Sequence, residues 1–147
     1  MKLTTRGHYS VKALLDLSLQ KSNTPVSVKE IGLRQGIPIA YLEKLLIEMR
    51  RAGLVVSFRG AQGGYKLAKL PGKISLGEIL ESVGEKIEPI LRYAPNTNHA
   101  EDWVTHCIWL MINKKLSEAL YNISLEDLYY DVRSWQAAVG EETSFVV

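Results

Sequence analysis

Two cations flank a glycine-rich segment at residues 59–66, which read RGAQGGYK. Glycine has no Cβ atom, so a backbone built from it can turn sharply and approach another molecule closely. An arginine at such a turn can enter the narrow groove of a nucleic acid, and a nearby lysine can contact a phosphate. The spacing therefore predicts a nucleic-acid contact made by Arg59, Gly60, Gly63, Gly64 and Lys66. An ordinary surface hairpin is the alternative interpretation.

Residues suited to covalent or redox chemistry are few. The single cysteine, Cys107, excludes an intrachain disulfide and supplies neither a CxxC pair nor a zinc-finger ligand set. The chain shows no nucleophile motif and no paired-carboxylate pattern, and GAQGGY matches neither the dinucleotide-binding fingerprint nor the P-loop. The sequence therefore argues against an enzyme.

Helical periodicity and capping signals place two helices before this segment. The first begins at Thr4 or Thr5, carries apolar residues on one side and ends near Lys21, before the turn SNTP. The second begins with the capping-box sequence SVKE at residues 27–30 and ends at Gly36, a typical helix stop. Both are predicted to pack through their apolar sides.

A third, amphipathic helix is predicted from Pro38 to just before Gly53, directly after a tight turn containing glycine. Two helices joined in this way form a helix-turn-helix pattern, in which the second helix can enter the major groove of DNA. A helical bundle with no DNA function shows the same pattern. The outward polar positions of the third helix are Glu43, Lys44, Arg50 and Arg51.

Two extended segments surround the glycines and place them at a hairpin tip. Residues 54–59 read LVVSFR and residues 65–69 read YKLAK, which are patterns typical of β-strands. A hairpin directly after a helix-turn-helix is the wing of a winged helix. The position of the hairpin therefore favours DNA binding over an ordinary surface turn.

Charge divides the chain into two unlike halves. Residues 1–73 contain 13 Lys and Arg against 4 Asp and Glu, a balance of +9, whereas residues 74–147 contain 5 against 12, a balance of −7. A basic unit of this kind suits a polyanion, because each cation near a phosphate releases condensed counterions. A solvated basic face is the alternative. The acidic half is expected to face away from DNA.

Length and composition predict one domain with an extension. The chain has 147 residues, 46% of them hydrophobic, which is enough to bury a core. We expect no membrane partner, because the sequence has no long uncharged apolar stretch and MKLTTRGHYS lacks an apolar signal segment. The expected location is cytoplasmic.

The C-terminal half is predicted to form a dimer interface. Residues 103–120 begin as a helix that is apolar nearly all round, and such a helix needs two covering surfaces. We expect its own domain to cover one side and a second copy to cover the other. A last helix follows Ser124, and a loose tail is expected over 139–147. The predicted interface residues are Trp103, Ile108, Ile112, Leu116 and Leu120.

Four segments carry a longer pattern: MKLTTRGHYSVKALLDL, PVSVKEIGLRQGIPIAYLEKLLIEMRRAGLVVSFRGAQGGYKLAK, ISLGEILESV and THCIWLMINKKLSEALYNISLEDLY. Together they resemble the Rrf-two family of winged-helix transcription regulators, typified by IscR, NsrR and CymR. The resemblance covers nearly the whole chain, and the last segment is similar to the dimerisation helix of that family.

The resemblance implies roles for matching positions. Glu43 would accept a hydrogen bond from a cytosine amino group in the major groove, and Arg59 would enter the minor groove. The positions matched to phosphate contacts, which set register without reading sequence, are Thr5, Arg6, Tyr9 and Tyr41. Ile39 and Ala40 replace more polar residues of IscR, so the operator sequence stays open.

The resemblance also raises the question of a sensor. Relatives that bind an iron-sulfur cluster carry three cysteines in and just after the loop equivalent to 84–102, and this chain lacks all three. Trp103 stands at one of those positions, three residues before a histidine that matches a cluster ligand. The remaining candidate sensor residues are His8, His99, His106 and Cys107.

We predict that no cluster is held by the three-cysteine arrangement and that Cys107 is a buried packing residue. An iron-sulfur cluster with non-standard ligands is the alternative. A small molecule, a metal or a partner protein remains open as the effector.

These observations predict a mainly α fold with a small β-hairpin wing. A winged helix-turn-helix domain is expected over 1–83, a sensor-type loop over 84–102, and a dimerisation helix with a C-terminal helix over 103–138. The expected function is that of a dimeric transcription regulator, a repressor, which binds a pseudo-palindromic DNA operator through the helix at 38–52 and the wing at 54–69. A winged-helix protein-interaction module is the alternative, as is a cluster-sensing regulator with an atypical ligand set.

Overall fold

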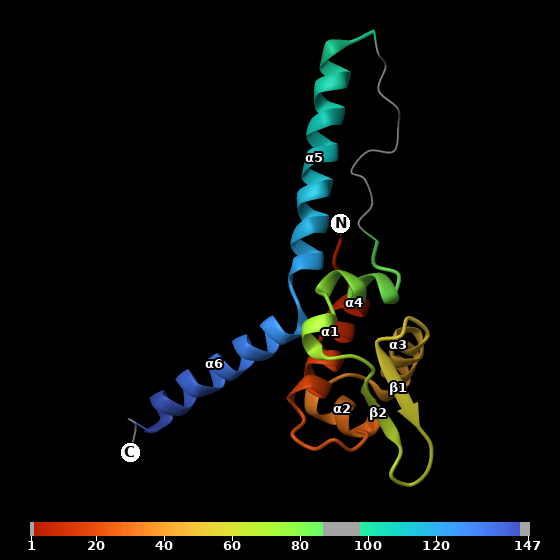
Figure 1. Cartoon of the computed structure of the whole chain (residues 1–147), viewed down its shortest axis with the longest axis vertical. Helices are drawn as coiled ribbons and strands as arrows, with labels where there is room; N and C mark the ends of the chain where they lie inside the picture. The colour runs from red at the N-terminus through yellow and green to blue at the C-terminus, as the bar shows by residue number, and fades with distance from the viewer. Residues whose placement is uncertain (1, 87–97, 145–147) are drawn as a thin grey trace.

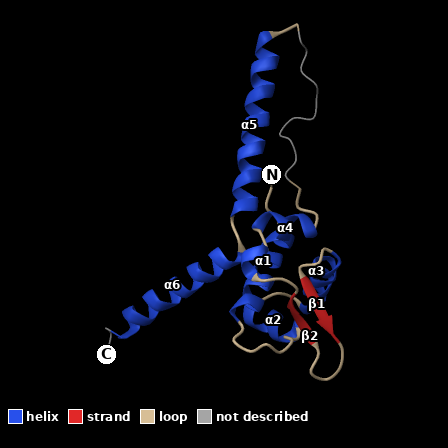
Figure 2. Cartoon of the chain, in the orientation of Figure 1, coloured by secondary structure: helices blue, strands red, loops and turns tan. Residues whose placement is uncertain are grey.

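A compact body carries two projecting helices (Figure 1). The computed structural model describes residues 2–86 and 98–144, with side chains described as far as Gly140. Its elements are α1 (Thr5–Leu19), α2 (Val28–Gln35), α3 (Ile39–Arg51), β1 (Val55–Phe58), β2 (Gly64–Leu67), the 3-10 helix η1 (Pro71–Lys73), α4 (Leu76–Ser82), α5 (Ala100–Asn122) and α6 (Leu125–Ser144). The body comprises α1 to α4 with the hairpin (Figure 2). The predicted mainly α fold with a hairpin wing is confirmed.

The ends of α2 follow from local chemistry. The Ser27 hydroxyl accepts a hydrogen bond from the Glu30 amide at 3.2 Å, and the Glu30 carboxylate accepts one from the Ser27 amide at 3.2 Å. Gly36 closes the helix with φ of 66°, a left-handed conformation that suits glycine. Both predicted ends of α2 are therefore confirmed. The first helix, α1, ends at Leu19, two residues before the expected end.

Helix α4 repeats this capping chemistry, although we assigned no helix to it from the sequence. The Glu78 carboxylate accepts a hydrogen bond from the Ser75 amide at 2.8 Å, and the Ser75 hydroxyl accepts one from the Glu78 amide at 3.1 Å. The bond from the Ser75 backbone lowers the pKa of Glu78. The signal was present in the S-x-x-E spacing, but seven residues are too few for helical periodicity to show.

The core lies between α1, α2, α3, α4 and the start of the hairpin. Its innermost side chains, all less than 2% exposed, include Leu14, Ile31, Leu42, Leu46 and Ile79. Apart from Val83, which caps the end of α4, Leu125 at the start of α6 is the one member of this cluster that follows α4 among the described residues. The body therefore holds a core of its own, and α5 and α6 contribute little to it.

The two projecting helices are longer than predicted. Helix α5 begins at Ala100 rather than at residue 103, so the loop that precedes it ends at His99. Helix α6 continues through Ser144, which corrects the expectation of a loose tail from residue 139. A single helical glycine such as Gly140 costs only about 1 kcal/mol relative to alanine, which is too little to end a helix. Across the described residues, no helix combines the length and apolar character that a membrane span requires.

Candidate nucleic-acid interface

Helix α3 presents a polar edge to solvent because its apolar residues fall on one side. Leu42, Leu45, Leu46 and Met49 are buried against the body. The opposite positions are exposed, and they are Ile39, Ala40, Glu43, Lys44, Arg50 and Arg51. The predicted reading positions therefore lie together on one accessible face. At the end of α3, the Arg50 guanidinium donates to the Ser57 hydroxyl on β1 at 3.3 Å, which links the helix to the wing.

The aromatic side chains predicted to lie near phosphates touch each other. Tyr9 on α1 and Tyr41 on α3 pack edge to face, with ring centroids 5.8 Å apart, and both are half-buried against the core. Thr5, at the start of α1, is exposed. The tyrosine pair therefore packs the N-terminal turn of α3 against α1, and both residues remain partly accessible at the surface.

Arg6 has a different environment from the one we expected. Its Nε donates to the Val83 carbonyl at 2.7 Å, and its Nη2 donates to the Glu48 carboxylate of α3. The bond to Glu48 raises the pKa of Arg6. Its donors are thus used to join α1, α3 and the end of α4. Sequence spacing alone could not show that Glu48 lies beside Arg6, because 42 residues separate them.

The conformation and packing of the chain itself explain why the wing contains glycine. Gly60 has φ of 108°, which other residues rarely adopt. A Cβ atom on Gly64 would lie 2.3 Å from the Val26 carbonyl oxygen, because the hairpin pairs there with the segment before α2. From the sequence, we expected these glycines to allow the close approach of a phosphate. The structure instead shows that Gly64 permits close approach to the chain's own backbone.

The two cations of the wing differ in their surroundings. Arg59 lies at the exposed tip of the hairpin, directly after β1. Lys66 on β2 is half-buried, and its ammonium lies over the Phe58 ring, 5.7 Å from the centroid. Arg59 is therefore the freer of the two to reach a ligand, whereas Lys66 also holds the outer face of the hairpin together.

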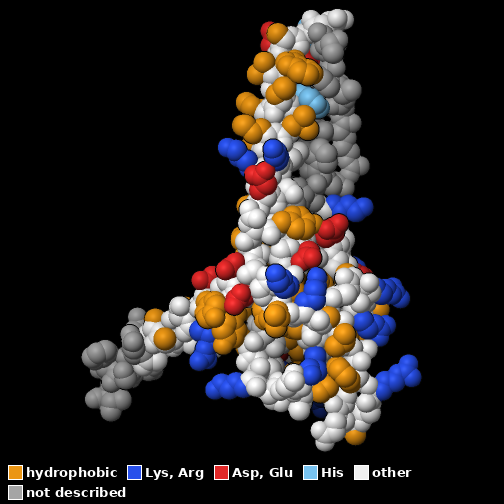
Figure 3. Space-filling model, in the orientation of Figure 1, with side chains coloured by type: hydrophobic (Ala, Val, Ile, Leu, Met, Phe, Trp, Pro, Cys, Tyr) orange, Lys and Arg blue, Asp and Glu red, His pale blue; other side chains and the backbone are white. Residues whose placement is uncertain are grey.

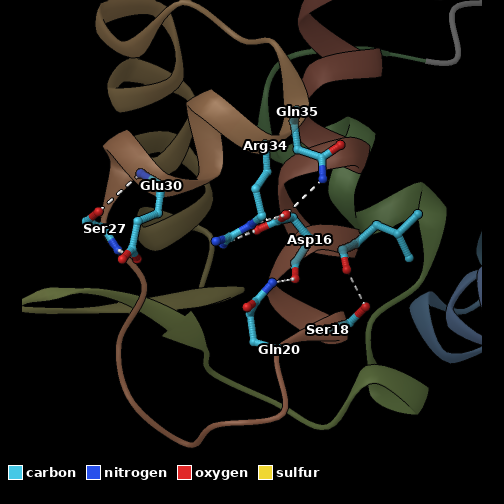
Figure 4. Close-up of polar contacts among 8 residues, drawn as sticks. Asp16, Ser18, Gln20, Ser27, Glu30, Arg34 and Gln35 are labelled. Carbon is cyan, nitrogen blue, oxygen red and sulfur yellow. Dashed lines mark hydrogen bonds and ion pairs between the residues drawn. The ribbon is translucent and has the colours of Figure 1, made fainter.

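A buried ionic cluster that we did not predict fixes α2 against α1 (Figure 4). The Asp16 side chain is 2% exposed and accepts two hydrogen bonds from Arg34, at 3.0 and 2.9 Å, and one from Gln35 at 2.8 Å. The bond with Asp16 raises the pKa of Arg34. A bidentate arginine with a third donor satisfies a buried carboxylate and holds the first helix of the helix-turn-helix in position.

Charge is distributed as the sequence predicted. Lys and Arg side chains are scattered over the lower body, whereas several Asp and Glu side chains lie near the bases of α5 and α6 and others lie higher on α5 (Figure 3). The face that carries α3 and the wing belongs to the +9 half of the chain. Such a face attracts a polyanion.

Helix α5 carries an uncovered apolar surface, which Figure 3 shows along its upper half. The side chains of Trp103, Ile108 and Ile112 are 55%, 43% and 41% exposed. Leu120 is only 8% exposed, because it packs against its own chain, and this corrects its place in the predicted interface. Leu116 is half-buried. Four further exposed large hydrophobic residues of α5 were missing from that prediction, namely Val104, Leu110, Met111 and Tyr121.

The candidate sensor residues do not converge within one chain. His8 lies exposed on α1, His99 precedes α5, and His106 and Cys107 lie within α5. Cys107 is exposed, which corrects the expectation that it packs in a core. The error arose because we expected the apolar start of α5 to be covered by its own domain, whereas α5 projects away from the body.

These residues do not fit an iron-sulfur cluster held by a single chain. No three His, Cys, Asp or Glu side chains lie close enough to hold a metal among the described side chains of residues 2–86 and 98–140. The sequence 87–97 adds neither Cys nor His, so each chain offers one thiol, and cluster iron is bound chiefly by thiolates. We derive no step of the function through such a group.

Comparisons with known proteins agree with this geometry. The Rrf2 family model, described as an iron-dependent transcriptional regulator, matches residues 3–131. Over 147 residues that span both proteins completely, the chain is 57% identical to slr0846 of Synechocystis sp., whose assignment as an HTH-type transcriptional regulator is provisional. It is 37% identical over 132 residues to the HTH-type transcriptional regulator IscR of Aliivibrio salmonicida, covering 89% of this chain and 79% of that protein.

Solved structures show the same likeness. The global cysteine regulator CymR of B. subtilis superposes with a TM-score of 0.77 at 31% identity, covering 88% of this chain and 97% of that one. IscR of T. potens superposes with a TM-score of 0.74 at 39% identity, covering 92% and 91%. The chain therefore belongs to the Rrf2 family of helix-turn-helix transcriptional regulators.

Proposed function

We propose that the protein represses transcription by binding a pseudo-palindromic DNA operator as a homodimer in the cytoplasm. The observation that carries this proposal is the exposed polar edge of α3, which continues through Arg50 to the wing and Arg59. Helix α3 occupies the major groove and the wing reaches the adjacent minor groove. Both elements belong to the half of the chain with a charge of +9.

Individual side chains then have distinct tasks. The Glu43 carboxylate accepts a hydrogen bond from a cytosine amino group, and so it reads a base. Lys44 and Arg50 contact phosphates, where they contribute affinity but no sequence information. Arg59 enters the minor groove, which favours narrow, A·T-rich segments.

A second copy of the chain covers α5. Trp103, Ile108 and Met111 are about half exposed in one chain, and together with Val104 and Cys107 they line a shallow apolar hollow. A symmetric dimer buries the same patch on both subunits and places two copies of α3 along one DNA duplex. An effector, whether a small molecule, a metal or a protein, acts through this C-terminal half.

The proposal is tested by selecting preferred duplexes from a random library and measuring affinity across a salt series. We expect a two-fold related consensus and an affinity that falls steeply with salt. The Arg59→Ala substitution is expected to cost about 1–3 kcal/mol of binding free energy. Arg133→Ala, which removes an exposed arginine from α6, is the matched control.

The Glu43→Ala variant separates base reading from general attraction. We expect it to relax the preference at one position in each half-site and to leave other positions unchanged. Glu118→Ala, on the exposed side of α5, is its control. A protein-interaction module would instead show no selected consensus and almost no salt-sensitive affinity, and that result would reject the proposal.

A further inference from the structure

Helices α5 and α6 leave the body at one junction, formed by the turn between them. The Leu76 amide donates to the Ile123 carbonyl at 2.8 Å, and the Leu125 amide donates to the Ile74 carbonyl at 2.8 Å. These two bonds make a short antiparallel bridge between residues 74–76 and 123–125. The turn is therefore attached to the start of α4, which belongs to the body.

A second contact joins the last turn of α5 to α4. The Tyr121 ring lies on Gly77 of α4, and a Cβ atom on Gly77 would come within 2.6 Å of the ring. The Tyr121 hydroxyl donates to the Glu81 carboxylate, one turn further along α4. This bond raises the pKa of Tyr121 to about 12, because it stabilises the protonated hydroxyl.

Helix α4 is a firm base for this contact. Ile79 and Leu80 are 0% and 4% exposed, so the helix is anchored in the body. The Tyr121 side chain also borders a hollow of about 340 Å³ between α4 and α5. Tyr121 can therefore shift without displacing the core.

We infer that Tyr121, seated on Gly77 and bonded to Glu81, is a positioning residue that determines which spacing between operator half-sites the dimer accepts. The inference rests on the proposed homodimer. A helix of 23 residues is about 35 Å long, so a rotation of about 5° at its base moves its far end by about 3 Å. That displacement is close to the rise of one base pair, about 3.4 Å.

The test measures affinity for operators whose half-sites are moved apart or together by single base pairs, and for an isolated half-site. Tyr121→Phe removes only the hydroxyl, whereas Gly77→Ala displaces the ring from the opposite side. Tyr130→Phe, an exposed tyrosine on α6, is the matched control. We expect the wild type and the control to prefer one spacing sharply.

In both junction variants, the affinity ratio between the preferred spacing and its neighbours should fall about threefold to tenfold, or the preferred spacing itself should change. A change of that size corresponds to the loss of one hydrogen bond. Affinity for the isolated half-site should stay unchanged. An unchanged spacing profile, or an equal loss at every spacing and at the half-site, would overturn the inference and leave the proposed function intact. A wild type with no spacing preference would overturn both.

Discussion

The body buries its apolar side chains within one chain, whereas the two projecting helices leave most of theirs exposed. In the body, the four helices α1 to α4 and the two-stranded hairpin surround side chains such as Leu14, Ile31 and Leu46, which have no exposed surface. In α5 and α6, only Leu120 and Leu125 are buried among the described side chains. The body is thus complete as a single chain, whereas the projecting helices leave many of their large apolar side chains exposed.

The region whose fold depends on a second molecule can be located from this difference in burial. Burying an aliphatic side chain stabilises a fold by about 1.5–3 kcal/mol, and most of α5 gains none of this within one chain. Isolated helices are marginal in water without packing. The body should therefore keep its structure at any protein concentration, and the upper part of α5 should depend on association.

The distribution of tryptophan gives a means of following the two regions separately. All three tryptophans lie in the projecting helices, as Trp103, Trp109 and Trp135. Tryptophan emission therefore reports on α5 and α6 alone, while amide hydrogen exchange resolved by segment reports on the body.

The largest effect is expected from a cavity in the body. Leu14 is fully buried, so Leu14→Ala should lower the free energy of unfolding by about 2–5 kcal/mol. The matched change Ile108→Ala, on the exposed face of α5, should leave amide protection of the body unchanged. Equal losses of protection from the two substitutions would contradict the separation of the two regions.

A charge on the exposed face of α5 should act on assembly instead. Ile108→Asp is expected to raise the dimer dissociation constant by about 100-fold or more, because a buried carboxylate at the interface would lack a partner. Sedimentation across a dilution series measures this, and tryptophan emission should shift to the red as dimers separate. Leu33→Asp alters a residue of α2 that is 72% exposed, and it should have no effect on association. A wild type that stays monomeric at micromolar concentration would remove α5 as an interface.

The buried ionic cluster provides a smaller test within the body. Asp16→Asn keeps the shape of the side chain but removes its charge, so the bidentate bond from Arg34 is weakened. We expect the free energy of unfolding, measured in urea, to fall by about 1–3 kcal/mol. The Arg34 side chain is 42% exposed and can be solvated, which limits the loss. Asp131→Asn on α6 is the control. Unchanged stability in Asp16→Asn would show that the cluster contributes nothing net.

The smallest effect should come from the cap of α4 and should depend on pH. The pKa of Glu78 is lowered below its ordinary value of 4.5, so its contribution is present above that pH and is lost as the pH falls through the folded value. The side chain is 38% exposed, so screening limits the contribution to about 0.5 kcal/mol. Glu78→Gln should therefore differ from the wild type at neutral pH and converge with it in acid, as measured by unfolding midpoints. A difference that widens in acid would reverse the sign of this argument.

The elements that could be predicted are those fixed by neighbours in the chain. The capping box at Ser27, the left-handed Gly36 and the hairpin around residues 60–63 all depend on contacts within a few residues. The apolar period of α3 separates its buried leucines from Glu43 and Lys44 in the same way. The candidate DNA-binding face followed from these local signals.

The features that were missed depend on partners far along the chain. Arg6 meets Glu48 and Val83, Asp16 meets Arg34, and Tyr121 meets Gly77 and Glu81. Cys107 was placed in a core because an apolar helix was assumed to be covered by its own domain. Composition gives no information on which surface covers a helix.

The winged helix-turn-helix, its basic charge and the apolar character of α5 could be deduced from the sequence, because periodicity, capping and charge are properties of the chain alone. The folded structure was needed to show that Gly64 allows the hairpin to pair with the segment at Val26, and that Leu120 is buried within its own chain. It also showed that α5 and α6 leave from one turn held on α4. These outcomes depend on distances between residues that lie far apart in sequence, and packing alone sets those distances.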